Sequence, residues 1–377
     1  MSPVLPPIKI WVLAPFLESD DPTIAYYYDF SQSIAEYTRC FEQLQVNWIW
    51  QPVTLQDYTQ VIQQIAQEKR NGRSFPIVLN LCDGDEMNGT PGISVIHCLE
   101  SAGLVYTGSD AHFYQITTSK IPMKRAFDGH GIPTPAWESI QHPQQDITGI
   151  FRRLGSPILL KPAVSGGSMG VGIRNVVETE SDLKKQLQEM FQGYRGWNLA
   201  TDGIIAEAYI SGREFTTMVL GSAHAHGHCR VLTPAERVFH ASLPEKERFL
   251  SFDRLWETYE DETPMPGADN FYEYAPAPLA MEPALARLSL DAYTALGGTG
   301  YTRVDLRQDQ QSGRLYVLEA NAQCGLSEDE DFTSIGAILR FSEMAFPDMI
   351  LHILEDACRR KGISHRITRI LQQQRVL

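Results

Sequence analysis

Long hydrophobic runs are missing from this 377-residue sequence, and no segment approaches the ~20 apolar residues that a membrane-spanning helix requires. Basic clusters are missing too: 32 Lys and Arg stand against 46 Asp and Glu, which gives a net charge of −14. A nucleic-acid or anionic-membrane partner needs a basic surface, so we expect neither partner. A bound nucleotide is still compatible with this charge, because it needs only a few local cations and a metal ion.

Cysteine is scarce, and no two of the six cysteines have the Cys-X-X-Cys spacing. This usage is typical of a reduced cytoplasmic protein and argues against a disulfide framework or a zinc site. An apolar run at residues 10–16 followed by acidic residues indicates a first β-strand and not a signal peptide. The length predicts two or three domains.

Strand-like and helix-like segments alternate over the first hundred residues. We expect strands at residues 8–16, 46–50, 76–82 and 104–107, and helices at 30–45, 57–69 and 91–102. This alternation predicts an α/β domain with a Rossmann-like parallel sheet, covered by helices on both faces. The glycine-rich turn at residues 82–92 follows a strand end, where ligands bind in open α/β sheets. A plain connection to the next helix explains this turn equally well.

Two further units follow, and we place the three domains at residues 1–115, 116–220 and 221–377. The second unit should contain a helix at 119–130 and strands at 157–162, 171–177, 203–210 and 214–220. In the third unit, residues 241–278 are polar, aromatic and proline-rich, which is typical of a lid over a substrate. His224, His226 and His228 alternate as strand residues do, and an exposed strand is favoured over a metal site.

A hairpin at residues 300–326 carries the most informative polar residues. Residues two apart on a strand share a face, so Arg303 and Asp305 should point one way, as should Glu319 and Asn321. Two carboxylates and an amide oxygen suit Mg²⁺, and the arginine would stabilise charge on a transferring phosphoryl group. A solvated hairpin face with an ordinary cross-strand ion pair explains the pattern equally well when it is taken alone.

A glycine-serine loop at residues 165–172 contains four glycines. Its backbone N–H groups can approach an anion closely, but the loop is neither a P-loop nor a Rossmann fingerprint. Lys161 ends the apolar strand just before it, where a lysine needs an anionic partner if it is buried. Glu207 and Glu214 follow around a strand–turn–strand, as plausible partners of an adenine amino group or a ribose hydroxyl.

The order of these motifs along the chain is specific. Lys120, Lys161-Pro, the glycine-serine loop, Glu207 to Glu214, Arg303-Val-Asp305 and Glu319-Ala-Asn321 follow one another as they do in the ATP-grasp superfamily. Within it, the sequence resembles the D-alanine–D-alanine ligase family over about residues 79–350. The resemblance implies a three-domain ATP-grasp fold, with the active site between the second and third domains. It also implies ATP and two Mg²⁺ ions as cofactors, with Mn²⁺ as a substitute.

The resemblance also implies a role for each matching residue. The residues that would bind ATP are Lys120 and Lys161 at the phosphates, Gly166, Gly167 and Ser168 as the flap over them, Glu207 and Ile210 at the adenine edge, and Glu214 at the ribose. The residues that would hold the metal ions are Asp305, Glu319 and Asn321. The residues that would act in catalysis are Arg303, Ser168 and Gly325.

Where the family binds its amino acids, this sequence departs from it. The first strand leads to Glu18 without the family's glycines and histidine, and Cys82-Asp83 replaces a His-Gly pair. Phe271-Tyr272-Glu273-Tyr274 keeps only part of a Tyr-Lys-Tyr-like signature, and the residues after Asn321 differ entirely. The nucleotide residues are kept while the amino-acid pockets are changed, so we expect a different donor and acceptor.

Residues 80–86 and the acidic loop after Gly325 resemble the ligases of mycosporine-like amino acid biosynthesis. Those enzymes join an amino acid such as serine or threonine to mycosporine-glycine and form an imine. The partners implied are therefore a small-molecule acid or enol-type donor and an amino acid amine, and a homodimer is compatible with the family. We expect residues 328–331 near the amine, although a solvated acidic turn explains them at least as well.

Two alternatives stay open. One is a true D-alanine–D-alanine ligase or another dipeptide ligase. The other is a nucleotide-binding regulatory protein without turnover, against which the intact Arg303, Asp305, Glu319 and Asn321 argue.

Overall fold

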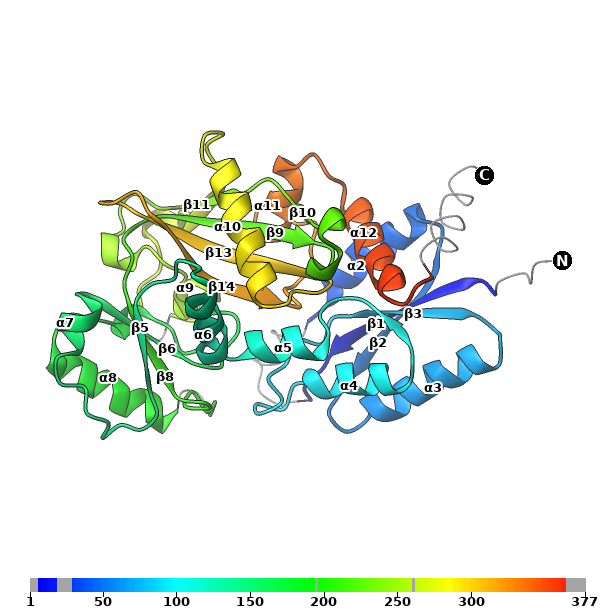
Figure 1. Cartoon of the computed structure of the whole chain (residues 1–377), viewed down its shortest axis with the longest axis horizontal. Helices are drawn as coiled ribbons and strands as arrows, with labels where there is room; N and C mark the ends of the chain where they lie inside the picture. Colours follow the sequence, from blue (N-terminus) through cyan, green and yellow to red (C-terminus); the bar gives the residue numbers. More distant parts are fainter. Residues whose placement is uncertain (1–5, 19–28, 194–195, 260–261, 364–377) are drawn as a thin grey trace.

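The fold is that of a computed structural model, which describes residues 6–18, 29–193, 196–259 and 262–363. Three β-sheets follow one another along the chain. Figure 1 shows the first sheet (blue and cyan) at one end of the molecule and the second (green) at the other, with the third between them. None of the described helices is long and apolar enough to cross a membrane.

The first sheet is the parallel sheet that the alternation predicts, with strand order β2-β1-β3-β4. Its elements are β1 (Ile8–Pro15), α2 (Ser31–Gln43), β2 (Asn47–Val53), α3 (Tyr58–Arg70), β3 (Phe75–Asn80), α4 (Ile93–Ser101) and β4 (Val105–Tyr106). Successive strand residues face opposite sides. Trp11 and Leu13 therefore pack on α3 and α4, while Ile10 and Val12 pack toward α2 and the last helix, α12 (Phe346–Arg360).

The second sheet is antiparallel, with strand order β5-β8-β6-β7. The elements of this region are α5 (Ala111–Thr118), α6 (Lys120–His130), β5 (Trp137–Ile140), α7 (Ile150–Leu154), β6 (Ile158–Pro162), η1 (Ile173–Asn175), β7 (Val176–Val177), α8 (Glu180–Gln192) and β8 (Ile204–Ala208). Helices α7 and α8 cover one face of this sheet, where Leu154, Leu183 and Leu187 pack against Leu160.

The third sheet is also antiparallel, with strand order β12-β11-β9-β13-β14 and β10 paired to β9. Its elements are β9 (Gly212–Leu220), η2 (Ala223–His228), β10 (Arg230–Val231), β11 (Ala235–Phe239), η3 (Glu245–Glu247), α9 (Phe252–Leu255), η4 (Pro266–Ala268), β12 (Tyr272–Pro276), α10 (Glu282–Ala295), β13 (Tyr301–Asp309), β14 (Leu315–Ala322) and α11 (Ser334–Phe341). Apolar residues such as Phe215, Val304 and Val317 bury one face of the sheet under α10, which leaves the other face for polar residues.

Three expectations about these elements were wrong. The strand predicted at 171–177 is reduced to β7, and the 3₁₀ helix η1 precedes it, because the Asn175 side chain accepts from Gly172 N (3.0 Å) and donates to Gly170 O (2.9 Å). The three alternating histidines lie in the 3₁₀ helix η2 and not in a strand. The predicted lid does not extend to residue 278, because β12 is part of the third sheet.

The domain boundaries are still proposals, but strand pairing bears on one of them. Strand β9, which a boundary at residue 220 assigns to the second unit, pairs with β11 and β13 of the third sheet.

A buried carboxylate joins α12 to the third sheet. Asp356 is 2% exposed and accepts hydrogen bonds from Ser222 N (3.1 Å) and Ser222 Oγ (2.8 Å) after β9. Arg359 and Arg360 lie 3.2 and 3.3 Å from its oxygens. Since α12 also covers the first sheet, this contact helps to hold the first and third sheets together.

We predict that Asp356→Ala lowers the free energy of unfolding by about 3 kcal/mol, because it removes one partner from a buried charged network. Urea unfolding measures this change. Asp291→Ala is the matched control, because Asp291 pairs with Arg287 on the exposed face of α10 and should change stability by less than about 1 kcal/mol. Equal stabilities of the two variants would contradict the prediction.

Candidate active site

A cavity of about 730 Å³ lies where the three sheets meet. Its walls include residues from the carboxyl ends of β1 and β3, from the glycine-serine loop and from the polar face of the third sheet. All the site residues predicted from the sequence line it, namely Lys120, Lys161, Gly166, Gly167, Ser168, Glu207, Ile210, Glu214, Arg303, Asp305, Glu319, Asn321 and Gly325. These residues therefore belong to a single site, although the role of each residue stays a prediction.

The β13–β14 hairpin supplies one wall of the cavity. Arg303 pairs with Asn321 and Asp305 with Glu319 across the two strands, so all four lie on one face. Arg303 Nη2 donates to Asp305 Oδ2 (2.9 Å), and Asn321 Nδ2 donates to the same oxygen (3.1 Å). Burial raises the pKa of Asp305, but the charges of Arg303 and Arg237 outweigh burial and hold that pKa below its usual value.

The donor set of this hairpin fits a divalent cation. Two carboxylates and one amide oxygen are the hard ligands that Mg²⁺ takes together with phosphate oxygens. Neither here nor elsewhere do the described residues include three or more His, Cys, Asp or Glu side chains grouped so that they could hold a metal ion by themselves. The residues therefore fit a metal ion that shares its ligands with a substrate, and do not form a closed metal cage.

A buried charge triad lies beside the hairpin. Lys124 Nζ lies 2.8 Å from Glu207 Oε2, with the two side chains 1% and 2% exposed, and Lys161 contacts the other carboxylate oxygen. Burial raises the pKa of Glu207, but the two lysines outweigh burial and lower it to about 2. Sequence analysis missed Lys124, although it lies four residues after Lys120 and so on the same helix face.

Lys120 connects the glycine-serine loop with the hairpin. Its Nζ lies 3.6 Å from Glu319 Oε2 and donates to Ser165 O (3.2 Å). The Lys120 ammonium group is thus held between the hairpin and the glycine-serine loop.

Glu214 lies between two arginines that sequence analysis also missed. Arg237 on β11 and Arg307 on β13 pair with Glu214 on β9, and all three are buried. Arg237 contacts one Glu214 oxygen, and Arg307 Nε lies 3.8 Å from the other. Arg307 follows Asp305 by two residues and continues its strand face, which was a usable signal. Arg237, in contrast, reaches Glu214 only because β11 pairs with β9, which the sequence did not indicate.

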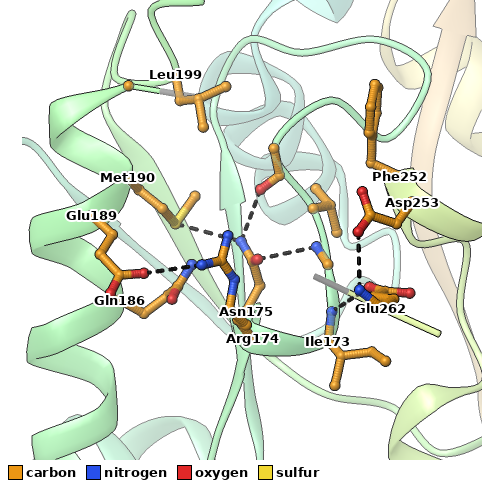
Figure 2. A pocket seen from close by; sticks show the side chains of 14 residues that line it. Ile173, Arg174, Asn175, Gln186, Glu189, Met190, Leu199, Phe252, Asp253 and Glu262 are labelled. Atoms are coloured by element: carbon orange, nitrogen blue, oxygen red, sulfur yellow. Dashed lines mark hydrogen bonds and ion pairs between the residues drawn. The ribbon is translucent and has the colours of Figure 1, made fainter. Parts of the chain in front are cut away.

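The segment between β11 and β12, residues 240–271, covers the glycine-serine loop, and we call it the lid segment. Phe252 N donates to Val171 O (2.8 Å), and Trp256 Nε1 donates to Gly167 O (2.8 Å). Glu262 Oε1 accepts from Ile173 N (2.8 Å). Figure 2 shows Glu262 beside Ile173 in the lining of a small pocket of about 60 Å³, to which Phe252 also contributes. The described residues of the lid segment, 240–259 and 262–271, are therefore bonded to the glycine-serine loop region.

Two other loops were considered as parts of the site, and only one of them lines the cavity. The glycine-rich turn after β3 does line the cavity, through Asp83, Asp85 and Thr90 among others. The acidic residues 328–331 do not line it, contrary to expectation, because Glu328 pairs with Arg39 and Asp329 accepts hydrogen bonds from the backbone of its own loop. Glu18 is absent from the lining as well.

Comparisons with known proteins agree with this geometry. The family model of the D-ala D-ala ligase C-terminus matches residues 127–355. A D-alanine–D-alanine ligase of Bordetella petrii is 32% identical over 232 residues, which are 61% of each chain. That of Stutzerimonas stutzeri is 28% identical over 298 residues, which are 79% of this chain and 81% of the relative.

Solved structures have the same fold. The D-alanine–D-alanine ligase of Bacillus anthracis complexed with ATP gives a TM-score of 0.64 at 20% identity, and covers 94% of this chain and 98% of that one. The Coxiella burnetii ligase gives 0.62 at 16% identity, covering 97% and 99%. The fold is thus the three-sheet ATP-grasp fold of carbon–nitrogen ligases. Because the family model matches more than half of its residues, the chain belongs to the D-alanine–D-alanine ligase family.

We predict that Glu319→Ala lowers turnover at least about 100-fold while thermal unfolding is unchanged, because it removes one of two carboxylates available to a metal ion. ADP release measures the turnover. Glu273→Ala is the control, since Glu273 lies on an exposed part of β12 in the same sheet and does not line the cavity. A Glu319→Ala rate close to that of the control would contradict the metal assignment.

We also predict that ATP with Mg²⁺ slows tryptic cleavage after Lys246 and Arg248 in the lid segment, because phosphates would order the loop to which that segment is bonded. Mass spectrometry of the fragments measures the rates. Cleavage after the exposed Arg287 is the internal control and should not change. Equal rates with and without the nucleotide would contradict a lid.

Proposed function

We propose that the protein uses ATP to convert a substrate oxygen into a phosphate ester or anhydride, which an amine then displaces to form a C–N bond. The observation that carries this proposal is the convergence of the hairpin face, the glycine-serine loop and the lysines on one cavity. Such a site binds a polyanion and stabilises the charge that develops on a transferring phosphoryl group.

Each group has a role in this proposal. Lys120 and Lys161 bind the ATP phosphates, and Arg303 stabilises the negative charge on the phosphorylated intermediate. Asp305, Glu319 and Asn321 would hold a Mg²⁺ ion, which would supply Lewis-acid stabilisation of the phosphate oxygens. The remaining predicted groups bind or cover the nucleotide and the oxyanion, namely Gly166, Gly167, Ser168, Glu207, Ile210, Glu214 and Gly325.

The pairing of the buried charges supports a nucleotide site of this kind. Glu207 keeps its negative charge between two lysines, so it accepts and does not donate hydrogen bonds near neutral pH. An exocyclic amino group of a base is a donor and matches such an acceptor. Glu214 between two arginines is an acceptor in the same way, which suits ribose hydroxyls.

D-alanine is the first candidate for both the donor and the amine. The relatives that support this choice are D-alanine–D-alanine ligases that match 61% and 79% of this chain. In this case the activated oxygen belongs to the carboxylate of one D-alanine, and the product is a dipeptide.

Mycosporine-glycine with an L-amino acid is the second candidate. The observation that favours it is that Asp83, Cys324 and Ser327 line the cavity and belong to stretches where this sequence departs from the family. The phosphate and metal residues would then serve an enol-type ring oxygen.

The test is ADP release with ATP and Mg²⁺, comparing D-alanine alone with mycosporine-glycine plus a panel of L-amino acids. We expect D-alanine alone to support turnover, because this chain keeps the family's phosphate and metal residues. Turnover in the second mixture only would transfer the proposal to the second candidate. ATP binding without ADP release in either mixture would contradict a ligase and favour a regulatory nucleotide-binding protein.

A further inference from the structure

Six carboxylates line the cavity, and their partners differ in an informative way. Five have a cationic or amide partner: Glu207 with two lysines, Glu214 with two arginines, Asp305 with Arg303, Glu319 with Lys120, and Asp85 with Asn88. The sixth, Asp83, has no side-chain partner among the described residues, and its side chain is exposed to the open space of the cavity.

The position of Asp83 in the first sheet is one where ligands bind. It follows β3 at the carboxyl edge, and β1 lies beside β3 although the chain visits β2 between them. This reversal of strand order leaves a crevice between the ends of β1 and β3, which is the usual ligand position in open α/β sheets. Pro15 and Leu17 after β1 line the same cavity.

The loop that carries Asp83 is held rigidly. Asp85 accepts from Asn88 N (2.9 Å), and Glu86 accepts from Ser94 N (2.7 Å), so these two carboxylates stabilise the loop itself. Tyr114 OH donates to Gly84 O (2.7 Å). A side chain at Gly84 would lie 2.1 Å from Thr90 O, so the loop needs glycine there. Asp83 is thus presented at a fixed place without a structural task of its own.

The Gln323 side chain bonds the region after the hairpin to the end of β3, just before this loop. Its Nε2 donates to Asn80 O (2.7 Å) at the end of β3, and its Oε1 accepts from Ser109 N (2.8 Å). Gln323 follows Asn321 by two residues and precedes Gly325 by two. Asp83 and the hairpin therefore line the same cavity, and the buried Gln323 side chain joins β14 to the end of β3.

We propose that Asp83 binds the positively charged amino group of an amino-acid substrate through an ion pair with its carboxylate. This inference rests on the proposed function, because the proposed ligase reaction is what requires an amino-acid substrate. An unpaired carboxylate in a cavity stabilises a cation more than a paired one does, since no protein cation competes for it.

The surroundings of Asp83 agree with this role. The protein around the cavity removes bulk water from the carboxylate and raises its pKa to about 6. No cation of the described chain offsets that effect, unlike at Glu207 or Asp305. An arriving ammonium group would supply the missing positive charge.

The test compares Asp83→Asn with wild-type protein in the ADP-release assay. The amine is the one that the wild-type protein uses, chosen from D-alanine, glycine, L-serine and L-threonine, with and without mycosporine-glycine. We expect the KM for this amino acid to rise about 10- to 100-fold, as for the loss of one charged hydrogen bond, while the KM for ATP stays within about twofold. Asp83→Glu keeps the charge and should recover part of the affinity.

Glu273→Gln is the control, because it removes a carboxylate charge from an exposed part of β12 that does not line the cavity. Its KM values should equal those of wild-type protein. Isothermal titration of the same amino acid in the presence of AMP-PNP and Mg²⁺ measures binding independently of turnover. An unchanged KM and affinity in Asp83→Asn would overturn this inference alone. Absence of ADP release by wild-type protein with every amino acid would instead overturn the proposed function, and this inference with it.

Discussion

Charge that is removed from water must be paired, and this constraint shapes the cavity on which the whole structure converges. Glu207 is ionised between Lys124 and Lys161, and Glu214 between Arg237 and Arg307. The partners come from helix α6, from the second sheet and from two strands of the third. Because each pair joins separate elements, the packing of these elements also brings the charged residues of the site together.

Among the contacts that join the first and third sheets, two involve residues far apart in the sequence, Gln323 and Asp356. Gln323 bonds the end of β14 to the end of β3, and there is room for it because Gly108 lacks a side chain, whose Cβ would lie 1.7 Å from Gln323 Oε1. Helix α12 covers the second face of the first sheet and is bonded through Asp356 to Ser222. These contacts hold two walls of the cavity in place. The glycine-serine loop and the lid segment, bonded to each other by Trp256, form the third wall.

The sequence was most informative where function depends on strand alternation and on motif order. Arg303 and Asp305 share a face because a strand has a period of two, and no tertiary information is needed to see it. The glycine-serine loop was recognisable because its composition is unusual and a lysine precedes it. The family and the ATP-grasp fold followed from the order of such motifs, and the comparisons support both.

Predictions from the sequence were wrong where a side chain pairs with a residue distant in the chain or bonds to the backbone nearby. Asn175 closes a turn and cancels a strand that its apolar neighbours predict. Residues 328–331 carry the charge expected near a substrate, yet Arg39, almost 300 positions away, pairs with Glu328 and directs it elsewhere. Period and composition do not reveal such partners.

The sequence by itself determined the parallel first sheet, the paired hairpin and many of the residues that line the cavity. Only the tertiary structure decided which charges pair, that Lys124, Arg237 and Arg307 complete the triads, and that Asp83 has no partner among the described residues. The physical reason is that local periodicity dictates which way a side chain points. Its partner is set by the register and packing of elements that are distant in the chain, where the cost of burying an unpaired charge selects the arrangement.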